Sequence, residues 1–449
     1  MGVNMKMIED LTCGNETNVL IRFAIPMIIG NLFQQLYNVA DTIIVGRFIG
    51  PNALAAVGSS FTVMVFLTSI ILGLCMGSGA VFSMLFGAGK TDTLKSSFFT
   101  SFCFIGLITI IINVCALVFI NEILSFMQIP KEVLIDTKEY LQIIFYGIVF
   151  TSIYNYFAAV MRSMGNSLVP LMFLIFSAII NIVLDIIFVV PLKMGVAGAA
   201  YATIIAQGFS AVGISIYCII KVPQIRLQRM HLHFESKIVK MIANYSILSS
   251  IQQSIMNFGI LMIQGLVNSF GVTTMAAFAA VVKIDSFAYM PVQDFGNAFS
   301  TFIAQNKGAN KQQRISKGIR SAVKIITLYC VITSILVLLF AKPLMNIFIS
   351  SSETEILHIG KQYLFIVGSF YCLIGYLFMF YGLFRGMGKP GFTIILTIFS
   401  LGIRVALAYT LSAVPSIGIL GVWWAIPIGW AVADIIGLCK VRSLIRQQS

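Results

Sequence analysis

The sequence is poor in charge. Only 10% of its 449 residues are Asp, Glu, Lys or Arg, whereas 59% are hydrophobic, and the mean hydropathy is +0.96. Soluble domains carry about 25% charged residues, so this composition excludes an ordinary soluble enzyme or binding domain. It is typical of a chain that crosses a membrane many times.

Several chemical signatures are also missing. The eight cysteines show no spacing typical of a metal site. The GKT sequence at Lys90 follows an apolar membrane segment rather than a strand, so it does not form a nucleotide-binding loop. No metal-ligand set and no pairing of nucleophile with base is present. We therefore expect neither an enzyme nor an ATP-driven pump, and no cofactor other than a coupling ion.

Long apolar segments fill the chain and leave no room for a soluble domain. A helix needs about 20 apolar residues to cross a bilayer. The sequence therefore predicts an all-α polytopic membrane protein with twelve transmembrane helices. The predicted spans are residues 19–45, 53–82, 97–120, 139–161, 168–190, 196–220, 240–268, 274–303, 320–341, 362–384, 392–411 and 420–439.

The positive charge is unevenly distributed along the chain. The formal net charge is +13, and with both termini in the cytoplasm, 21 of the 29 Lys and Arg residues fall in the termini and the even-numbered loops. Cytoplasmic loops of membrane proteins carry such an excess. We therefore expect a multi-pass protein of a prokaryotic plasma (inner) membrane with both termini cytoplasmic. The charge would serve topology and contact with anionic lipids, not binding of nucleic acid.

The chain also repeats itself. With an offset of 221 residues Gly50 matches Gly271, and with an offset of 223 residues Tyr140 matches Tyr363. Six helices per half is an even number, so equivalent helices run in the same direction. The two halves are then related by a pseudo-two-fold axis along the membrane normal.

This repeat predicts two six-helix lobes, residues 1–220 and 241–449, joined by a basic cytoplasmic linker at 221–240. A linker of this length would let the lobes move as bodies. Transporters built from such repeats bind near the midplane and alternate access by rocking their halves. A two-lobe carrier can work alone, so we expect a monomer.

Four stretches of the chain resemble the multidrug and toxic compound extrusion (MATE) family. They are PMIIGNLFQQLYNVADTIIVGRFIGPNALAAVG in the first two helices, MRSMGNSLVP at 161–170, GNAFSTFIAQNKGA at 296–309 and FRGMGKP at 384–390. The resemblance implies a twelve-helix, two-lobe antiporter that expels amphipathic, often cationic compounds in exchange for Na⁺ or H⁺.

Asp41 lies inside the first apolar span. A carboxylate at the centre of a membrane helix costs about 2.5–3.5 kcal/mol even on lenient scales, and such residues usually mark an ion or substrate path. In the fifth helix Asn181 and Asp185 are four residues apart, which places them on one face. The expected cation-binding residues of the amino-terminal lobe are Asp41, Asn155, Asn181, Asp185 and Thr203.

This oxygen-rich set suits a hard monovalent cation, and Na⁺ could be held by Asp41, Asn181, Asp185 and Thr203. The two carboxylates could instead share a proton, because neighbouring like charges oppose each other in a low-dielectric site. The MATE resemblance implies the same five residues around an amino-lobe cation site. The alternative for the amides and Thr203 is ordinary hydrogen bonding between helices.

Other polar residues within the spans are candidates for a substrate cavity. Gln34 and Tyr37 lie one to two turns before Asp41 and would face the same lumen, although packing between helices would explain them equally well. The carboxy-terminal lobe contributes Asn257, Asp285 and Arg404.

The charges of the carboxy-terminal lobe allow two interpretations. Buried basic residues need partners, so we expect Arg404 or Lys283 to pair with Asp285 or Asp294. The sharper interpretation is that this cluster takes part in substrate binding or in a second proton step.

The favoured function is a secondary active exporter of amphipathic cations. The alternative is a flippase for lipid-linked oligosaccharides, which would use Arg404 and Lys283 to hold a diphosphate. Asp41 and Asp185 argue against it, because a polyanion gains nothing beside two carboxylates.

Overall fold

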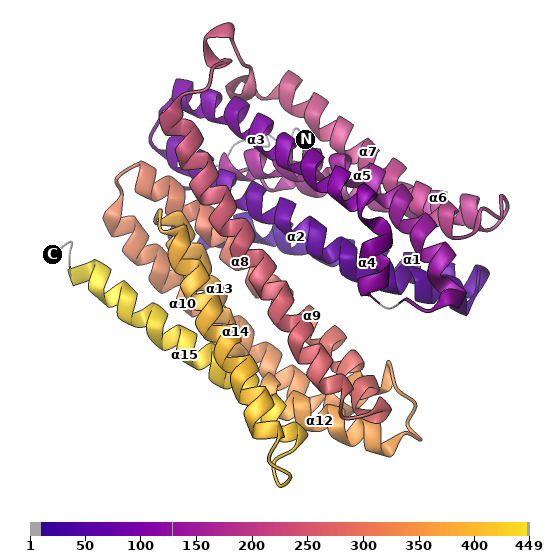
Figure 1. The fold of residues 1–449 in the computed structure, drawn as a ribbon. Helices are drawn as coiled ribbons and strands as arrows, with labels where there is room; N and C mark the ends of the chain where they lie inside the picture. Colours follow the sequence, from indigo (N-terminus) through magenta and orange to yellow (C-terminus); the bar gives the residue numbers. More distant parts are fainter. Residues whose placement is uncertain (1–9, 128, 447–449) are drawn as a thin grey trace, which may run out of the picture. The chain divides into compact units, whose positions relative to one another are not determined.

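The computed structural model describes residues 10–127 and 129–446, and all regular structure in these ranges is helical (Figure 1). The helices are α1 (Glu16–Phe48), α2 (Pro51–Gly87), α3 (Thr91–Val118), α4 (Ile120–Phe126), α5 (Lys131–Ser163), α6 (Leu168–Val189), α7 (Gly195–Lys221), η1 (Pro223–Ile225), η2 (Arg229–His231), α8 (Ser236–Asn268), α9 (Val272–Gly308), α10 (Gln312–Leu339), α11 (Ala341–Asn346), α12 (Thr354–Gly368), α13 (Tyr371–Gly386), α14 (Pro390–Ser412) and α15 (Ile419–Arg446).

Within the described ranges, eleven helices are long and apolar enough to cross a membrane, and the pair α12 and α13 forms one further span with a bend of 52°. The predicted all-α polytopic fold with twelve spans is therefore confirmed. The tenth span, predicted as one helix over 362–384, is broken instead. The hydroxyl of Ser369 donates to the Phe365 carbonyl at 2.5 Å, and such back-bonding by serine often bends helices.

The internal repeat is visible in the backbone. The short helices α4 and α11 begin at Ile120 and Ala341, at the same offset that relates Gly50 to Gly271. These two glycines precede α2 and α9 with φ of 130° and 93°. Glycine adopts such angles at little cost, so the same turn recurs at the same place in both halves.

The chain forms two compact units. The first contains Ile25–Ser250, and the second contains Thr12–Ala24 and the chain from Ile251 onward. Two helices therefore change unit along their length, α1 next to its internal Pro26 and α8 after Ser250. The sequence predicted lobes at residues 1–220 and 241–449 that move as bodies about a linker at 221–240. That division of the chain stays a prediction.

In the first unit, α5 packs against α2 and α7, and α7 packs against α6 (Figure 1). Aromatic side chains fill the core next to α5. The rings of Phe82 and Phe98 lie 4.8 Å apart, edge to face, and the Tyr156 hydroxyl donates to the Phe98 carbonyl at 2.7 Å. Edge-to-face pairs add to the stability gained by burial, so this core holds α5 rigidly beside the polar residues of α6 and α7.

Candidate functional site

Two carboxylates lie within the first unit at membrane depth. Asp185 of α6 is fully buried and Asp41 of α1 is half-buried, and their charges interact. Oδ1 of Asp41 and both carboxylate oxygens of Asp185 are buried without a hydrogen-bond partner among the described residues. Buried acceptors are normally satisfied, so these three oxygens are available to a cation or a proton.

Asn181 adds an amide oxygen one turn before Asp185. Its side chain donates from Nδ2 to Thr203 Oγ1 at 3.4 Å, and the Thr203 hydroxyl in turn donates to the Ala199 carbonyl at 3.0 Å. The side-chain oxygen of Asn181, Oδ1, is buried and has no partner in the described chain. The amide nitrogen of Asn181 and the hydroxyl of Thr203 thus donate within the protein, whereas the side-chain oxygen of Asn181 is left for a ligand.

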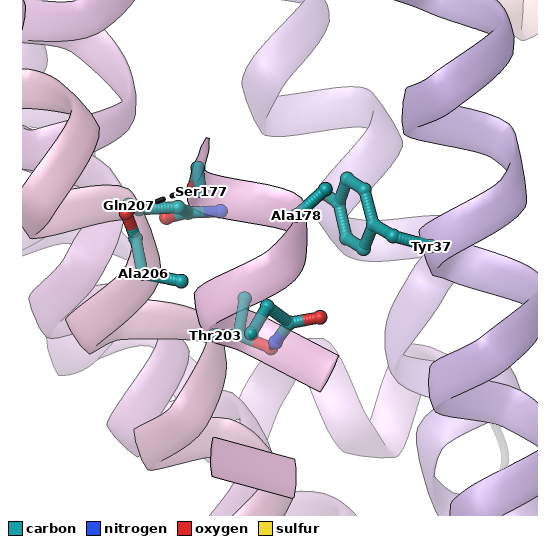
Figure 2. A pocket seen from close by; sticks show the side chains of 7 residues that line it. Tyr37, Ser177, Ala178, Thr203, Ala206 and Gln207 are labelled. Carbon is teal, nitrogen blue, oxygen red and sulfur yellow. Dashed lines mark hydrogen bonds between the residues drawn. The ribbon is translucent and has the colours of Figure 1, made fainter. Parts of the chain in front are cut away.

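A small cavity opens beside Asn181 and Thr203, between α1, α6 and α7 (Figure 2), and neither Asp41 nor Asp185 is among its lining residues. The space open to the centre of a water molecule is about 10 Å³, roughly what one water needs. A single water or a small cation is therefore of the right size. The lining residues are Tyr37, Ser177, Ala178, Asn181, Thr203, Ala206 and Gln207.

Three residues near this cavity were not expected from the sequence. Ser177 lies one turn before Asn181, and Gln207 one turn after Thr203, so helical spacing from the predicted residues would have found them. Tyr140 of α5 is buried and interacts electrostatically with both carboxylates of the cluster. Its match with Tyr363 in the repeat was the available signal.

The remaining amino-terminal candidates lie at the edge of the cluster. Asn155 is half-buried on α5 and donates to the Thr151 carbonyl of its own helix at 2.8 Å. Thr151 in turn donates to Gln207 Oε1 at 2.8 Å. Gln34 is half-buried on α1 and interacts with Tyr37. Like Asp41 and Asp185, Asn155 and Gln34 are not among the residues that line the cavity.

In the second unit Asp285 of α9 is 7% exposed. The Tyr363 hydroxyl donates to its Oδ2 at 2.5 Å, and the Tyr371 hydroxyl donates to its Oδ1. These tyrosines stand on either side of the break between α12 and α13, so the bend brings both phenols to one carboxylate.

The expected pairing of Arg404 or Lys283 with Asp285 or Asp294 is not seen as a direct ion pair at Asp285, where the charge of Arg404 acts without a contact. Both oxygens of Asp285 are taken by tyrosines, and Lys283 is exposed with its ammonium 5.7 Å from the centre of the Phe348 ring. Arg404 of α14 makes no ion pair within the described chain, although its charge acts on Asp285. Its Nε is buried without a partner there.

The other two candidates of the second unit take no part in the hydrogen bonds to Asp285. Asn257 is half-buried on α8, and Asp294 is 4% exposed on α9. Neither contributes a hydrogen bond to Asp285, whose two partners are Tyr363 and Tyr371.

The donor set narrows the kind of ion that the amino-terminal cluster can hold. The described chain contains no group of three or more His, Cys, Asp or Glu side chains placed to bind a metal. The available atoms of Asp41, Asn181 and Asp185 are all oxygens, which hard cations prefer. The residues therefore fit a hard cation or a proton.

Comparison with known proteins gives the family. The MatE family profile matches residues 26–187 and 246–410, which lie in both halves of the repeat. The chain belongs to the MatE family. The resemblance to MATE transporters found in the sequence is therefore confirmed.

Similar MatE proteins cover almost the whole chain. The probable multidrug resistance protein YpnP of Bacillus subtilis is 30% identical, over 87% of this chain and 87% of YpnP. The probable multidrug resistance protein YoeA of the same organism is 27% identical, over 92% and 91%. A solved structure of a multidrug resistance MATE family transporter of the MOP superfamily, in its outward-facing conformation, has a TM-score of 0.93 at 25% identity, covering 100% of this chain and 99% of the other.

Proposed function

We propose that this MatE protein is a secondary active multidrug exporter that moves amphipathic, mostly cationic compounds in exchange for Na⁺ or H⁺. Its family and the multidrug resistance proteins that it resembles support transport. The observation that carries ion coupling is the group of buried acidic and amide oxygens without partners on Asp41, Asn181 and Asp185.

The cluster can couple ion binding to a change of shape because its acids stand on different helices. Asp41 belongs to α1 and Asp185 to α6, and their negative charges repel each other. A cation or proton between them removes this repulsion and ties the two helices together. A ligand shifts a conformational equilibrium only by its differential affinity for the two states, and a site whose oxygens come from two helices provides that difference.

The neighbouring residues have supporting roles in this proposal. Thr203 and Asn181 position each other and place their oxygens at the ion, while Gln207 and Tyr37 line the cavity beside it. Na⁺ would be held by the oxygens of Asp41, Asn181, Asp185 and Thr203. No step of the cycle needs a further cofactor, and the protein is proposed to act as a monomer in the plasma membrane with both termini cytoplasmic.

The test is ethidium efflux from proteoliposomes in which Na⁺ and proton gradients are imposed separately. Asp41→Asn and Asp185→Asn should each abolish efflux driven by the coupling ion, because the ion's differential affinity is lost; each 1.4 kcal/mol of that affinity is worth about tenfold. Glu132→Gln, an exposed acid at the start of α5, is the matched control and should transport normally.

Normal ion-driven efflux by a correctly inserted Asp41→Asn variant would show that the site is wrong. The gradient that drives the native protein identifies its coupling ion. Scrambling of a labelled lipid-linked oligosaccharide in the same vesicles would instead support the flippase. We do not favour that function, because Asp41 and Asp185 would repel a diphosphate.

A further inference from the structure

The repeat places the two polar clusters at equivalent positions. Tyr140 of the first unit corresponds to Tyr363 of the second, and Asn181 corresponds to Arg404. Tyr140 interacts with the carboxylates of the amino-terminal cluster, and Tyr363 hydrogen-bonds to Asp285. The Asp285 cluster is therefore the counterpart of the amino-terminal cation site.

The two clusters carry their charges differently. With the same offsets, Asp41 corresponds to Met262 and Asp185 to Ala408, so neither acid recurs in the second half. The cluster of the second half is built on a different acid, Asp285 of α9. It also carries a guanidinium, that of Arg404, where the first half has a neutral amide.

Both oxygens of Asp285 are occupied, because each lies in a hydrogen bond with a phenol hydroxyl. A buried carboxylate needs a positive partner. Lys283 is exposed, and the positive charge that acts on Asp285 is that of Arg404.

The charge of Arg404 acts on the same cluster. Arg404 interacts electrostatically with Tyr363, Asp285 and Tyr289. Its backbone is fixed by a close approach of α15, where Gly429 leaves no room for a Cβ beside the Ser400 carbonyl and the Arg404 Cβ. The positive charge is thus held in place by the fold and cannot leave during a transport cycle.

We propose that Arg404 is the permanent cation of a closed site built on Asp285, Tyr363 and Tyr371. The Asp285 site then exchanges no coupling ion. This statement concerns only that site, whereas exchange of the ion at the amino-terminal cluster rests on the proposed function.

The test counts cations bound by the purified full chain in detergent. Radioactive Na⁺ bound at equilibrium and protons taken up, followed with an indicator dye, are added to give the exchangeable cations per protein. Arg404→Asn should raise this number by about one per protein, because a buried carboxylate without a fixed counter-charge takes up a cation. Adding Asp285→Asn to that variant should restore the native number.

Two control variants separate the effect from a general change in charge. Lys283→Asn removes one positive charge from an exposed position two residues from Asp285 and should leave the count unchanged. Arg404→Lys keeps the charge and should also leave it unchanged. A native count in a folded Arg404→Asn protein, or a reduced count in Asp285→Asn alone, would overturn the closed site.

Where Arg404→Asn does not fold, the neutral double variant Arg404→Asn/Asp285→Asn decides. It should bind cations as the native protein does, and a lower count would refute the inference. Asp41→Asn in the native background tests the proposed function separately. If that variant retains all exchangeable cations, the amino-terminal site fails while the Arg404 and Asp285 variants still report on the second unit.

Discussion

A glycine seam in the first unit sets the distance between α2 and the first part of α8. Gly73 and Gly77 are one turn apart on α2, and a Cβ at either position would overlap the α8 backbone, at Ser250 and Ser246 respectively. The Ser78 hydroxyl shares a hydrogen bond of 2.8 Å with that of Ser246. Small residues at this spacing let membrane helices approach closely, so we expect Gly77→Ala to push the helices apart.

The cost of Gly77→Ala follows from the distances. The new methyl would lie 2.6 Å from the Ser246 Cα, about 1 Å inside the usual separation of carbon atoms, and a helix backbone cannot rotate away. Overpacking of this kind costs about 1–3 kcal/mol, while alanine recovers about 1 kcal/mol of helix propensity. Strain on the serine hydrogen bond adds about 0.6 kcal/mol. The net loss should be about 0.6–2.6 kcal/mol.

The assay is thermal unfolding of the purified protein in detergent, followed by circular dichroism. Gly58→Ala is the matched control, because it makes the same change on the same helix where no atom lies within 4 Å of the added Cβ. It should be neutral or slightly stabilising. Equal unfolding temperatures for Gly77→Ala and Gly58→Ala would refute the argument from close approach.

Two further predictions concern the core and the linker of the first unit. Phe82 is fully buried, and Phe82→Ala should lower the stability by about 3–5 kcal/mol, measured in the same unfolding assay. His231 is 1% exposed, with Nδ1 accepting the Gln228 N–H at 3.0 Å and Nε2 lying 3.3 Å from Asp92 Oδ1. Loss of both contacts in His231→Ala should speed proteolysis of the segment 221–240 about tenfold, as expected for about 1.4 kcal/mol of local stability.

Each of these variants has a control of the same residue type. Phe209→Ala removes a ring that is 65% exposed and should cost much less than Phe82→Ala. His233 is exposed, so His233→Ala should leave the proteolysis rate unchanged. Equal effects within either pair would mean that burial does not decide the outcome.

The fold was largely predictable because membrane-spanning helices can be recognised from their length and apolar composition. The twelve spans and the repeat follow from the sequence, and Gly50 with Gly271 marks the same turn in both halves. The break between α12 and α13 was not predicted, because no proline or charge interrupts 362–384. A serine hydroxyl bonded to the preceding turn, as at Ser369, has too weak a sequence signal to place a bend.

The candidate site was predicted in part. Spacing along α6 placed Asn181 and Asp185 on one face, and the structure brings Asn181 together with Thr203. The hydrogen-bond partners of Asp285 were missed, because pairing acids with bases takes no account of tyrosine hydroxyls. Tyr363 and Tyr371 lie more than 75 residues from Asp285 along the chain, and sequence spacing says nothing about such contacts.

The repeat carries more information about the second unit than the rule of charge pairing does. Once Tyr140 is known to stand beside the carboxylates of the first cluster, its equivalent Tyr363 marks where the second cluster must lie. The residue types then differ in a definite way, since an amide in the first half is replaced by Arg404 in the second. In the closed site that we propose, the duplicated cluster keeps its tyrosine and has a tethered cation in place of an exchangeable one. Asymmetry of function between the halves therefore requires only a few changes of charge within a shared backbone plan.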